Sequence, residues 1–486
     1  MGIILGHLKP ELLWNHFEEI CKYPRPSKKE EKIAAHIVSV GERLGLETTK
    51  DKFGSILIRK PATPGFENRK TVVLQSHIDM VCEKNRGVEH DFDNDPIQPY
   101  IDGEWVKAKG TTLGADNGIG VAAALSVLES KDIQHGPIEA LFTLDEETGL
   151  TGANSLKKNW LKADILINMD SEEEGSIYIG CSGGLNTRAS FKVKPEKTPK
   201  NNLAFELNVT GLKGGHSGLE INIGRANAVK LLIRLLYSYG KTNEYRIASI
   251  EGGNKHNAIP REAFAKVVIP KKDEKTFKKF VKKFNATVKE EYVSAEPDLK
   301  VGLDKVKNVE KVFNLKLQKN LINALYAVPH GVIKMSPDIP DLVETSTNLA
   351  VVTTEGKHVN VVTTQRSSVA SEITDIRDMV SSAFELAGAE LMYNDGYPGW
   401  KPDMNSEILK VFKKSFSDLY GKEPEIKAIH AGLECGIIKE KYPDMDMISF
   451  GPTMFGVHSP DEKLKIDTVP KFWDQLVKAL ENIPAK

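Results

Sequence analysis

The chain has 486 residues, of which 40% are hydrophobic and 27% are charged. This balance is typical of a soluble globular protein, and the length allows two or three domains. The 66 basic and 67 acidic residues leave a formal net charge of −1, so we expect no nucleic acid and no membrane surface among its partners. The four cysteines are widely spaced, and the N-terminus has no apolar run of signal-peptide length. Both features predict a cytoplasmic protein with reduced thiols.

The first part of the chain alternates helix-like and strand-like segments. Residues 29–44 place apolar side chains on one helical face, and residues 118–130 form an apolar helical stretch after a glycine-rich turn. Residues 71–75 form a valine-rich run typical of a buried strand, and residues 138–144 and 165–168 are further strand candidates. Such alternation predicts an α/β fold with a largely parallel sheet.

The character of the sequence changes after about residue 184. Residues 190–300 are rich in lysine, and the apolar residues within 277–284 follow helical spacing, with lysines on the other face. We interpret that segment as a solvated helix packed on a sheet. Domain boundaries are predicted near residues 186 and 397. Further expected elements are a strand at 204–209, a helix from about 225, helices at 408–419 and 471–480, and a strand at 447–450.

Five short segments bring acids and histidines to the ends of apolar runs. In open α/β sheets, ligands bind outside the carboxyl ends of the strands. Alone, a His-x-Asp pair is more often structural and a Glu-Glu pair is usually surface charge, but the five segments together are difficult to explain as surface. They carry His77 with Asp79, Asp116, Glu146 with Glu147, Asp170, and His458.

These residue types suit a site for two zinc ions. Zinc binds imidazole nitrogen and carboxylate oxygen, and two neighbouring metal ions need a carboxylate that bridges them. His77 and Asp79 are two residues apart, so in an extended chain they point the same way and Asp79 can orient the imidazole. One of Glu146 and Glu147 can bind metal while the other takes a proton from water. The residues alone do not say which does which.

At these motifs the sequence resembles the M20 family of di-zinc peptidases, in particular its aminoacyl-histidine dipeptidase branch. The similarity extends over nearly the whole chain, and the order of the motifs is specific. They read YPRPS, SHIDMV, GTTLGADNG, DEETGLTGA, NMDSEE, GLKGGHSG, VETSTNLA, HAGLECG and GVHSPDE.

The resemblance implies a zinc-peptidase catalytic domain with a mixed, largely parallel sheet and an inserted α+β lid domain. Residues 1–186 and 398–486 would form the catalytic domain, and residues 187–397 the lid and dimerisation domain of a homodimer. The family also has a non-proline cis peptide bond after the residue that matches Asp116.

The resemblance also implies two Zn²⁺ ions per subunit, with Mn²⁺ or Co²⁺ as possible substitutes. It makes Asp116 the bridging ligand, places Glu147 and His458 on one ion, and places His77 and Asp170 on the other. Glu146 becomes the general base and Asp79 the support of His77.

Four residues outside the metal site are candidates for substrate binding. His216 lies in a Gly-Gly-His-Ser-Gly segment that we expect to be a flexible loop, and the resemblance implies that it holds the scissile carbonyl, often across a dimer interface. Arg366 could bind a carboxylate through two parallel hydrogen bonds. Asn257 could bind the substrate backbone, and Glu434 lies in a segment that resembles a glycine-rich, substrate-facing loop of the family. The residues alone also allow a role without substrate for three of them. His216 could be a histidine of a turn, Asn257 an asparagine of a loop, and Arg366 a member of a surface ion pair.

We therefore predict a metallo-dipeptidase that hydrolyses unblocked dipeptides, with a possible preference for Xaa-His. The alternatives are another M20-type amidohydrolase, such as a tripeptidase or an N-acyl amino acid deacylase, and a non-catalytic binding protein on the same fold. The last would require a lost ligand or base, whereas all five ligand positions and both acids are present.

Overall fold

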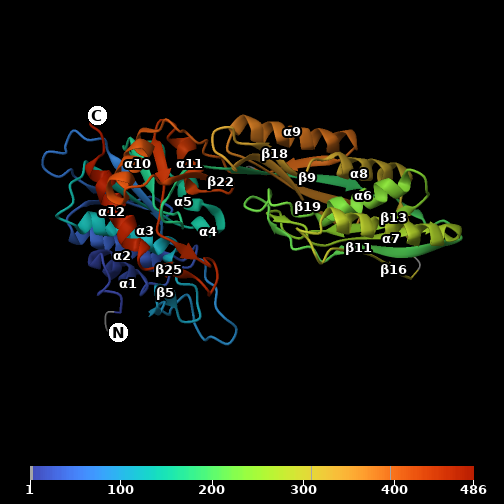
Figure 1. Cartoon of the computed structure of the whole chain (residues 1–486), viewed down its shortest axis with the longest axis horizontal. Helices are drawn as coiled ribbons and strands as arrows, with labels where there is room; N and C mark the ends of the chain where they lie inside the picture. Colours follow the sequence, from blue (N-terminus) through green and yellow to red (C-terminus); the bar gives the residue numbers. More distant parts are fainter. Residues whose placement is uncertain (1–3, 308, 395) are drawn as a thin grey trace. The chain divides into compact units, whose positions relative to one another are not determined.

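The computed structural model describes residues 4–307, 309–394 and 396–486. The chain divides into two compact units (Figure 1). Unit 1 contains Met1–Gly180, Trp400–Ala428 and Leu433–Lys486, and unit 2 contains Cys181–Gly399 and Ile429–Gly432. Unit 1 thus combines the two ends of the sequence. The short segment Ile429–Gly432 lies in unit 2, although the sequence analysis had assigned 398–486 as a whole to the catalytic domain.

A mixed sheet with a parallel centre forms the frame of unit 1. Its strand order is β1-β2-β6-β3-β7-β23-β8-β22. β3 pairs in parallel with β6 and β7, and β23 pairs in parallel with β7, whereas β1, β2 and β8 join in antiparallel fashion. The predicted α/β class with a mixed sheet is confirmed, but only the central strands β6-β3-β7-β23 pair in parallel. The strands are β1 Glu47–Lys50, β2 Ile56–Lys60, β3 Val72–His77, β6 Ile138–Thr143, β7 Ile165–Asn168, β8 Ser176–Cys181, β22 Glu425–Ile429 and β23 Asp446–Ser449.

Helices cover this sheet because their apolar faces need burial. β3 is buried along its whole length, as expected for a strand covered on both faces. Helix α3 is apolar on all sides and almost entirely buried, and this position suits such a helix. A smaller sheet has the order β24-β25-β5-β4. The helices are α1 Glu11–Ile20, α2 Glu31–Arg43, α3 Ala115–Glu129, α4 Glu146–Gly149, α5 Thr151–Ser155, α10 Glu407–Tyr420, α11 Glu434–Lys441 and α12 Thr468–Glu481; the small strands are β4 Pro99–Asp102, β5 Trp105–Ala108, β24 Met454–Phe455 and β25 Lys463–Lys465.

Unit 2 is built on an antiparallel sheet. Its strand order is β16-β11-β15-β13-β19-β20-β9-β21, and β18 pairs with β19. Two short ladders, β10 with β17 and β12 with β14, lie outside this sheet. The strands are β9 Gly183–Lys192, β10 Pro195–Lys197, β11 Asn202–Thr210, β12 Gly215–His216, β13 Arg246–Gly252, β14 Ala258–Ile259, β15 Ala263–Pro270, β16 Lys300–Lys305, β17 Lys311–Phe313, β18 Gly331–Met335, β19 Val343–Glu355, β20 His358–Ser367 and β21 Glu390–Tyr393.

The core of unit 2 lies between one face of this sheet and its helices. Alternate residues of the strands, such as Phe205, Leu207 and Val209 in β11, are buried in one cluster with residues from all four long helices. Helix α7 contributes Phe277 and Phe284 at helical spacing and leaves its lysines outside, as predicted. The helices are α6 Ala228–Gly240, η1 Lys271–Asp273, α7 Glu274–Glu291, α8 Leu315–Ala327 and α9 Ala370–Leu386. In the described part of the chain, no helix has the length and apolar character needed to span a bilayer.

Candidate metal centre

His77 and Asp79 lie where strand β3 ends. His77 is the last residue of the strand and is buried. Its Nδ1 lies 3.3 Å from Oδ1 of Asp79, and the Ser27 hydroxyl donates to Oδ2 of Asp79 at 2.8 Å. Burial would raise the pKa of Asp79, but the neighbouring His77 outweighs it, and the pKa falls to about 2. Asp79 is therefore an ionised carboxylate that can fix the orientation of the His77 ring.

Asp116 lies in a turn that interrupts the start of helix α3. Asp116 and Asn117 have non-helical backbone angles, and the peptide bond between them is cis, as the family resemblance implied. The buried carboxylate of Glu462 accepts the backbone N–H groups of residues 113–116, with distances from 2.7 to 3.3 Å. These bonds fix the backbone that carries Asp116.

The five predicted ligands come together around Asp116. Oδ1 of Asp116 lies 3.0 Å from Nε2 of His77, and Oδ2 lies 3.1 Å from Nε2 of His458. Nε2 of His77 also lies 3.3 Å from Oδ1 of Asp170, and Nε2 of His458 lies 3.0 Å from Oε2 of Glu147. The side chains thus form two groups that share Asp116, each with its candidate ligand atoms within 4.8 Å of one another.

This donor set fits two divalent metal ions. Each group offers one imidazole nitrogen and two carboxylate oxygens, which is chemistry that Zn²⁺ accepts. Burial raises the pKa of Asp170 to about 6, whereas hydrogen bonds with Asp116 and Glu147 raise the pKa of His458 to about 11. The metal-free site therefore retains protons at its ligands, and bound cations would replace them.

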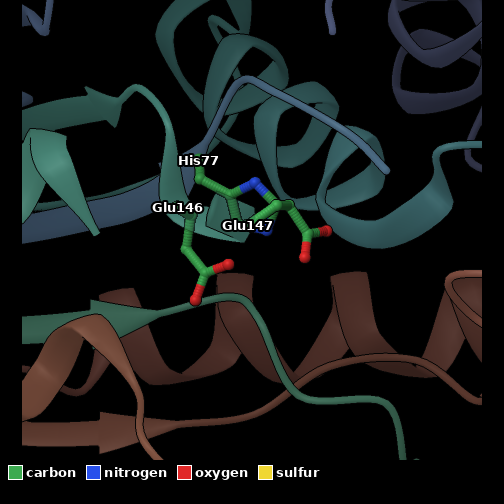
Figure 2. A group of neighbouring side chains, drawn as sticks. All are labelled: His77, Glu146 and Glu147. Carbon is green, nitrogen blue, oxygen red and sulfur yellow. The ribbon is translucent and has the colours of Figure 1, made fainter. Parts of the chain in front are cut away.

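Glu146 and Glu147 begin the short helix α4 directly after β6. The backbone N–H of Glu146 donates to Oδ1 of Asp79 at 3.0 Å, and that of Glu147 donates to Oδ2 at 3.2 Å. In Figure 2 their carboxyl groups point in different directions around the His77 ring. The Glu147 carboxylate meets His458, whereas burial holds the pKa of Glu146 well above its usual range. The two neighbouring acids therefore occupy distinct environments.

Glu434 lies beneath this site and does not reach the surface. The sequence analysis expected it in a substrate-facing loop, but it is the first residue of α11 and its side chain is completely buried. Its Oε2 accepts from the Gln75 amide and from the Thr143 hydroxyl, each at 2.6 Å. Burial raises the pKa of Glu434 to about 7. The hydrogen bonds continue from Gln75 to Asn168 at 2.5 Å, so this network joins the central strands.

The structure places the other three predicted substrate residues in unit 2. His216 lies in the short ladder of β12 with β14, where a flexible loop had been expected. Asn257 is exposed beside this ladder, and its carbonyl accepts the Ser217 N–H at 2.9 Å. Arg366 is buried in β20 and donates to the Tyr397 hydroxyl at 2.7 Å. A surface ion pair therefore does not describe Arg366.

The ring nitrogens of His216 have defined roles. Its Nδ1 accepts the backbone N–H groups of Gly218 at 3.2 Å and Leu219 at 3.0 Å. Burial, followed by the charge of Arg366, lowers the pKa of His216 to about 4. At neutral pH the ring is uncharged, and the proton resides on Nε2, which is then available as a donor.

A further acidic group has its carboxylates satisfied by hydrogen bonds. Glu30, Asp79 and Asp145 are buried close together. Oε1 of Glu30 accepts the backbone N–H groups of Lys28 and Asp145, each at 2.9 Å, and both oxygens of Asp145 accept from threonine hydroxyls. These acids organise the turn before α4.

Residues 73–482 match the peptidase family M20/M25/M40. The chain belongs to peptidase family M20. The resemblance predicted from the sequence motifs is therefore confirmed. Among relatives, the cytosol non-specific dipeptidase of Escherichia coli (strain K12) is 46% identical over 482 residues, which cover 99% of each chain.

Two solved peptidase structures are similar to this chain. The aminoacylhistidine dipeptidase of Vibrio alginolyticus is 48% identical and superposes with a TM-score of 0.94, covering 99% of this chain and 98% of that one. A tripeptidase of Staphylococcus aureus is only 16% identical, with a TM-score of 0.56 over 98% of this chain and 99% of that one, and shares the fold.

Sequence reasoning missed several residues that organise the M20 site. Ser27 and Glu462 belong to quoted motifs, but nothing in their spacing linked Ser27 to Asp79 or Glu462 to the turn of Asp116. The Asn117 amide donates to Oδ1 of Asp170, another contact that only the folded chain reveals.

Proposed function

We propose that this M20 peptidase is a metal-dependent dipeptidase that hydrolyses unblocked dipeptides. The observation that carries the proposal is the placement of Asp116, whose two oxygens face the Nε2 atoms of His77 and His458 at 3.0 and 3.1 Å. A carboxylate shared in this way is what a pair of metal ions requires. The names of the two relatives matched over nearly the full chain, both dipeptidases, support the choice of substrate.

Two zinc ions are the proposed cofactor, with Mn²⁺ or Co²⁺ as substitutes. His77 and Asp170 would hold one ion, Glu147 and His458 the other, and Asp116 both. When bound, the ions would lower the pKa of the attacking water and polarise the scissile carbonyl.

Glu146 is the proposed general base. It begins the short helix after β6, and its carboxyl group points away from that of Glu147 (Figure 2). It lies near the His77 ring but forms no ion pair with a histidine among the described residues, whereas Glu147 pairs with His458. Glu146 would take the proton of the attacking water and return it to the leaving amine. Asp79 would keep His77, Glu146 and Glu147 in place, since it contacts the His77 ring and both backbone N–H groups.

Three residues of unit 2 are proposed substrate ligands. His216 would donate its Nε2–H to the carbonyl oxygen, because its Nδ1 already accepts two backbone N–H groups. Arg366 would bind the C-terminal carboxylate of the dipeptide. Asn257 would bind the substrate backbone, as its exposed side chain allows. For Glu434 we propose a supporting role through Gln75 and Thr143, since its side chain is completely buried.

A cytoplasmic homodimer completes the proposal. The name of the Escherichia coli relative places that protein in the cytosol, and the wide spacing of the cysteines suits a reducing compartment. Light scattering on the purified protein would measure its mass, and a monomer at micromolar concentration would contradict the dimer.

A substrate panel tests the activity. The zinc-reconstituted enzyme should hydrolyse alanyl-leucine, several Xaa-His dipeptides and β-alanyl-histidine at rates that rank its side-chain preference. It should leave N-acetyl-leucine and trialanine nearly untouched. Preferential hydrolysis of N-acetyl-leucine would indicate a deacylase, and preferential hydrolysis of trialanine a tripeptidase. Either result would overturn the dipeptidase assignment.

A further inference from the structure

The side chains of Arg366 and Tyr397 meet across strand β9. Gly184 in β9 is the register partner of Arg366 in β20. On its other side, Gly184 exchanges two backbone hydrogen bonds with Tyr397, at 2.9 and 3.0 Å. Nη1 of Arg366 donates to the Tyr397 hydroxyl at 2.7 Å. The tyrosine ring therefore reaches over the strand that separates it from the arginine.

Two glycines leave the space that the Tyr397 ring occupies. A Cβ atom at Gly184 would lie 2.6 Å from Cζ and 2.7 Å from the hydroxyl oxygen of the ring. A Cβ atom at Gly432 would lie 2.7 Å from Cε2. Real Cβ atoms do not approach carbon so closely, so any side chain at either position would displace the ring. The absence of side chains at Gly184 and Gly432 thus leaves room for the Tyr397 ring beside Arg366.

Both polar groups still have a hydrogen to donate. Arg366 is only 5% exposed, yet its Nε–H has no hydrogen-bond partner among the described residues. The Tyr397 hydroxyl accepts from Arg366, which leaves its own O–H for an external acceptor. The Arg366 guanidinium and the Tyr397 hydroxyl therefore both retain hydrogens that a ligand could accept.

The surroundings favour an anionic ligand next to His216. A Cβ atom at Gly218 would lie 3.3 Å from Nε of Arg366 and 3.1 Å from the His216 ring, so the two side chains are neighbours. Burial, followed by the charge of Arg366, lowers the pKa of His430 to about 3, and that of His216 is also lowered. Both histidines are neutral at pH 7, and the positive charge at this place belongs to Arg366.

We propose that Tyr397 is a second ligand of the substrate's C-terminal carboxylate. Arg366 donates through Nη2 to the carboxylate, because Nη1 is already committed to Tyr397 and an oxygen bound to Nη2 on that side lies beside the Tyr397 hydroxyl. The Tyr397 O–H donates a further bond, which is strengthened because its oxygen accepts from a guanidinium group. The assignment rests on the proposed dipeptidase function, and it makes a free carboxylate on the second residue a requirement for tight binding.

Steady-state kinetics with alanyl-leucine and alanyl-leucinamide test this assignment. In Tyr397→Phe the KM for alanyl-leucine should rise about tenfold or more, since a hydrogen bond to a charged group is lost, while kcat changes little. The kcat/KM for the amide, which has no carboxylate, should be the same in both enzymes. Tyr326→Phe is the matched control, because Tyr326 is an exposed tyrosine of the same unit, and its kinetics should stay unchanged.

Gly184→Ala supplies an independent variant. Alanine fits a β-strand, but its Cβ would displace the Tyr397 ring, so it should raise the same KM, and the double variant should lose no more than either single one. Thermal unfolding midpoints close to that of the wild type would show that both variants fold.

Two outcomes separate this assignment from the proposed function. A wild-type enzyme that hydrolyses no dipeptide would overturn both. An active wild type, with Tyr397→Phe unchanged on alanyl-leucine or equally impaired on the amide, would overturn the role of Tyr397 alone.

Discussion

The carboxylate of Glu462 accepts the backbone N–H of Asp116 at 3.3 Å, although 346 positions separate the two residues in sequence. The same carboxylate accepts the three preceding N–H groups of the turn. Glu462 touches none of the five candidate metal ligands through their side chains. It determines instead the backbone position from which Asp116 presents one oxygen to each imidazole.

Replacement of Glu462 by glutamine should weaken metal binding. The glutamine amide group would oppose some of the N–H groups that the carboxylate accepts, so the Asp116 turn would shift. We expect zinc affinity to fall about ten- to a hundredfold, as it does when supporting partners of metal ligands are removed. Titration against a chromophoric chelator measures this change. Glu104→Gln, at an exposed acid that lies near Lys465, is the control, and equal affinities in the two variants would contradict the role of Glu462.

Separate replacement of Glu146 and of Glu147 should show which residue is the general base and which binds metal. Glu146→Gln should lower kcat about 10²- to 10⁴-fold, because a general base is lost, and should leave two zinc ions per chain. Glu147→Gln should lose zinc, since Glu147 is half of a pair with His458. Activity assays combined with elemental analysis provide both readings. An active Glu146→Gln enzyme would refute the assignment of the base.

Removal of the metal should abolish activity and lower stability. Without cations, the five proposed ligands would face one another unscreened. Zinc added back at a free concentration of 100 times its dissociation constant would stabilise the fold by about 2.7 kcal/mol. Dialysis against a chelator, followed by assays and thermal unfolding with and without added zinc, tests this prediction. Hydrolysis by a protein verified to be metal-free would contradict the proposed mechanism.

Acidification should destabilise the fold through His430. This residue is buried, its Nε2 lies 2.7 Å from the Ser346 hydroxyl, and its pKa is about 3 in the folded chain because of burial and the nearby Arg366 and His216. In the unfolded chain a histidine titrates near about 6.5. The unfolded state therefore binds the extra proton below that pH, and stability falls as the pH decreases from about 6.5 toward 3.

The measurement compares the wild type with His430→Gln. Denaturant unfolding at pH 6 and pH 5 should show that the wild type loses up to about 1.4 kcal/mol more per pH unit than the variant. The difference between the two proteins removes the contribution of the other groups that titrate in this range. Identical pH dependences would show that His430 does not stay neutral in the folded chain.

Much of the fold could be predicted from the hydrophobic patterns of the strands. Residues 165–168 were predicted as a strand and form β7 with the same bounds, with three apolar residues followed by a buried asparagine. β3 was predicted to end at residue 75 but continues through Ser76 to His77. Hydrophobicity ends where the functional residues begin, so a polar strand end is the part that a pattern underestimates.

The candidate site was predictable in its residues but not in its supports. Spacing and chemistry brought the five ligands and two acids together, whereas the order of Glu146 and Glu147 came from the family resemblance. Contacts such as Glu462 with the Asp116 turn join distant segments and leave no local pattern. His216 was expected in a flexible loop but pairs with β14. The Gly-Gly-His segment has no strand-like pattern of its own, and its partner Ala258–Ile259 lies about 40 residues later in the sequence.

The two oxygens of Asp79 tie the neighbouring acids Glu146 and Glu147 to one anchor. An attempt to change the metal preference by moving Glu147, a proposed ligand, would therefore also disturb Glu146, the proposed general base. Selection for a new metal would have to begin at His458 or Asp170, whose positions are set by other strands and loops. Because both acids are bonded to Asp79, the positions of His458 and Asp170 can change independently, whereas those of Glu146 and Glu147 cannot.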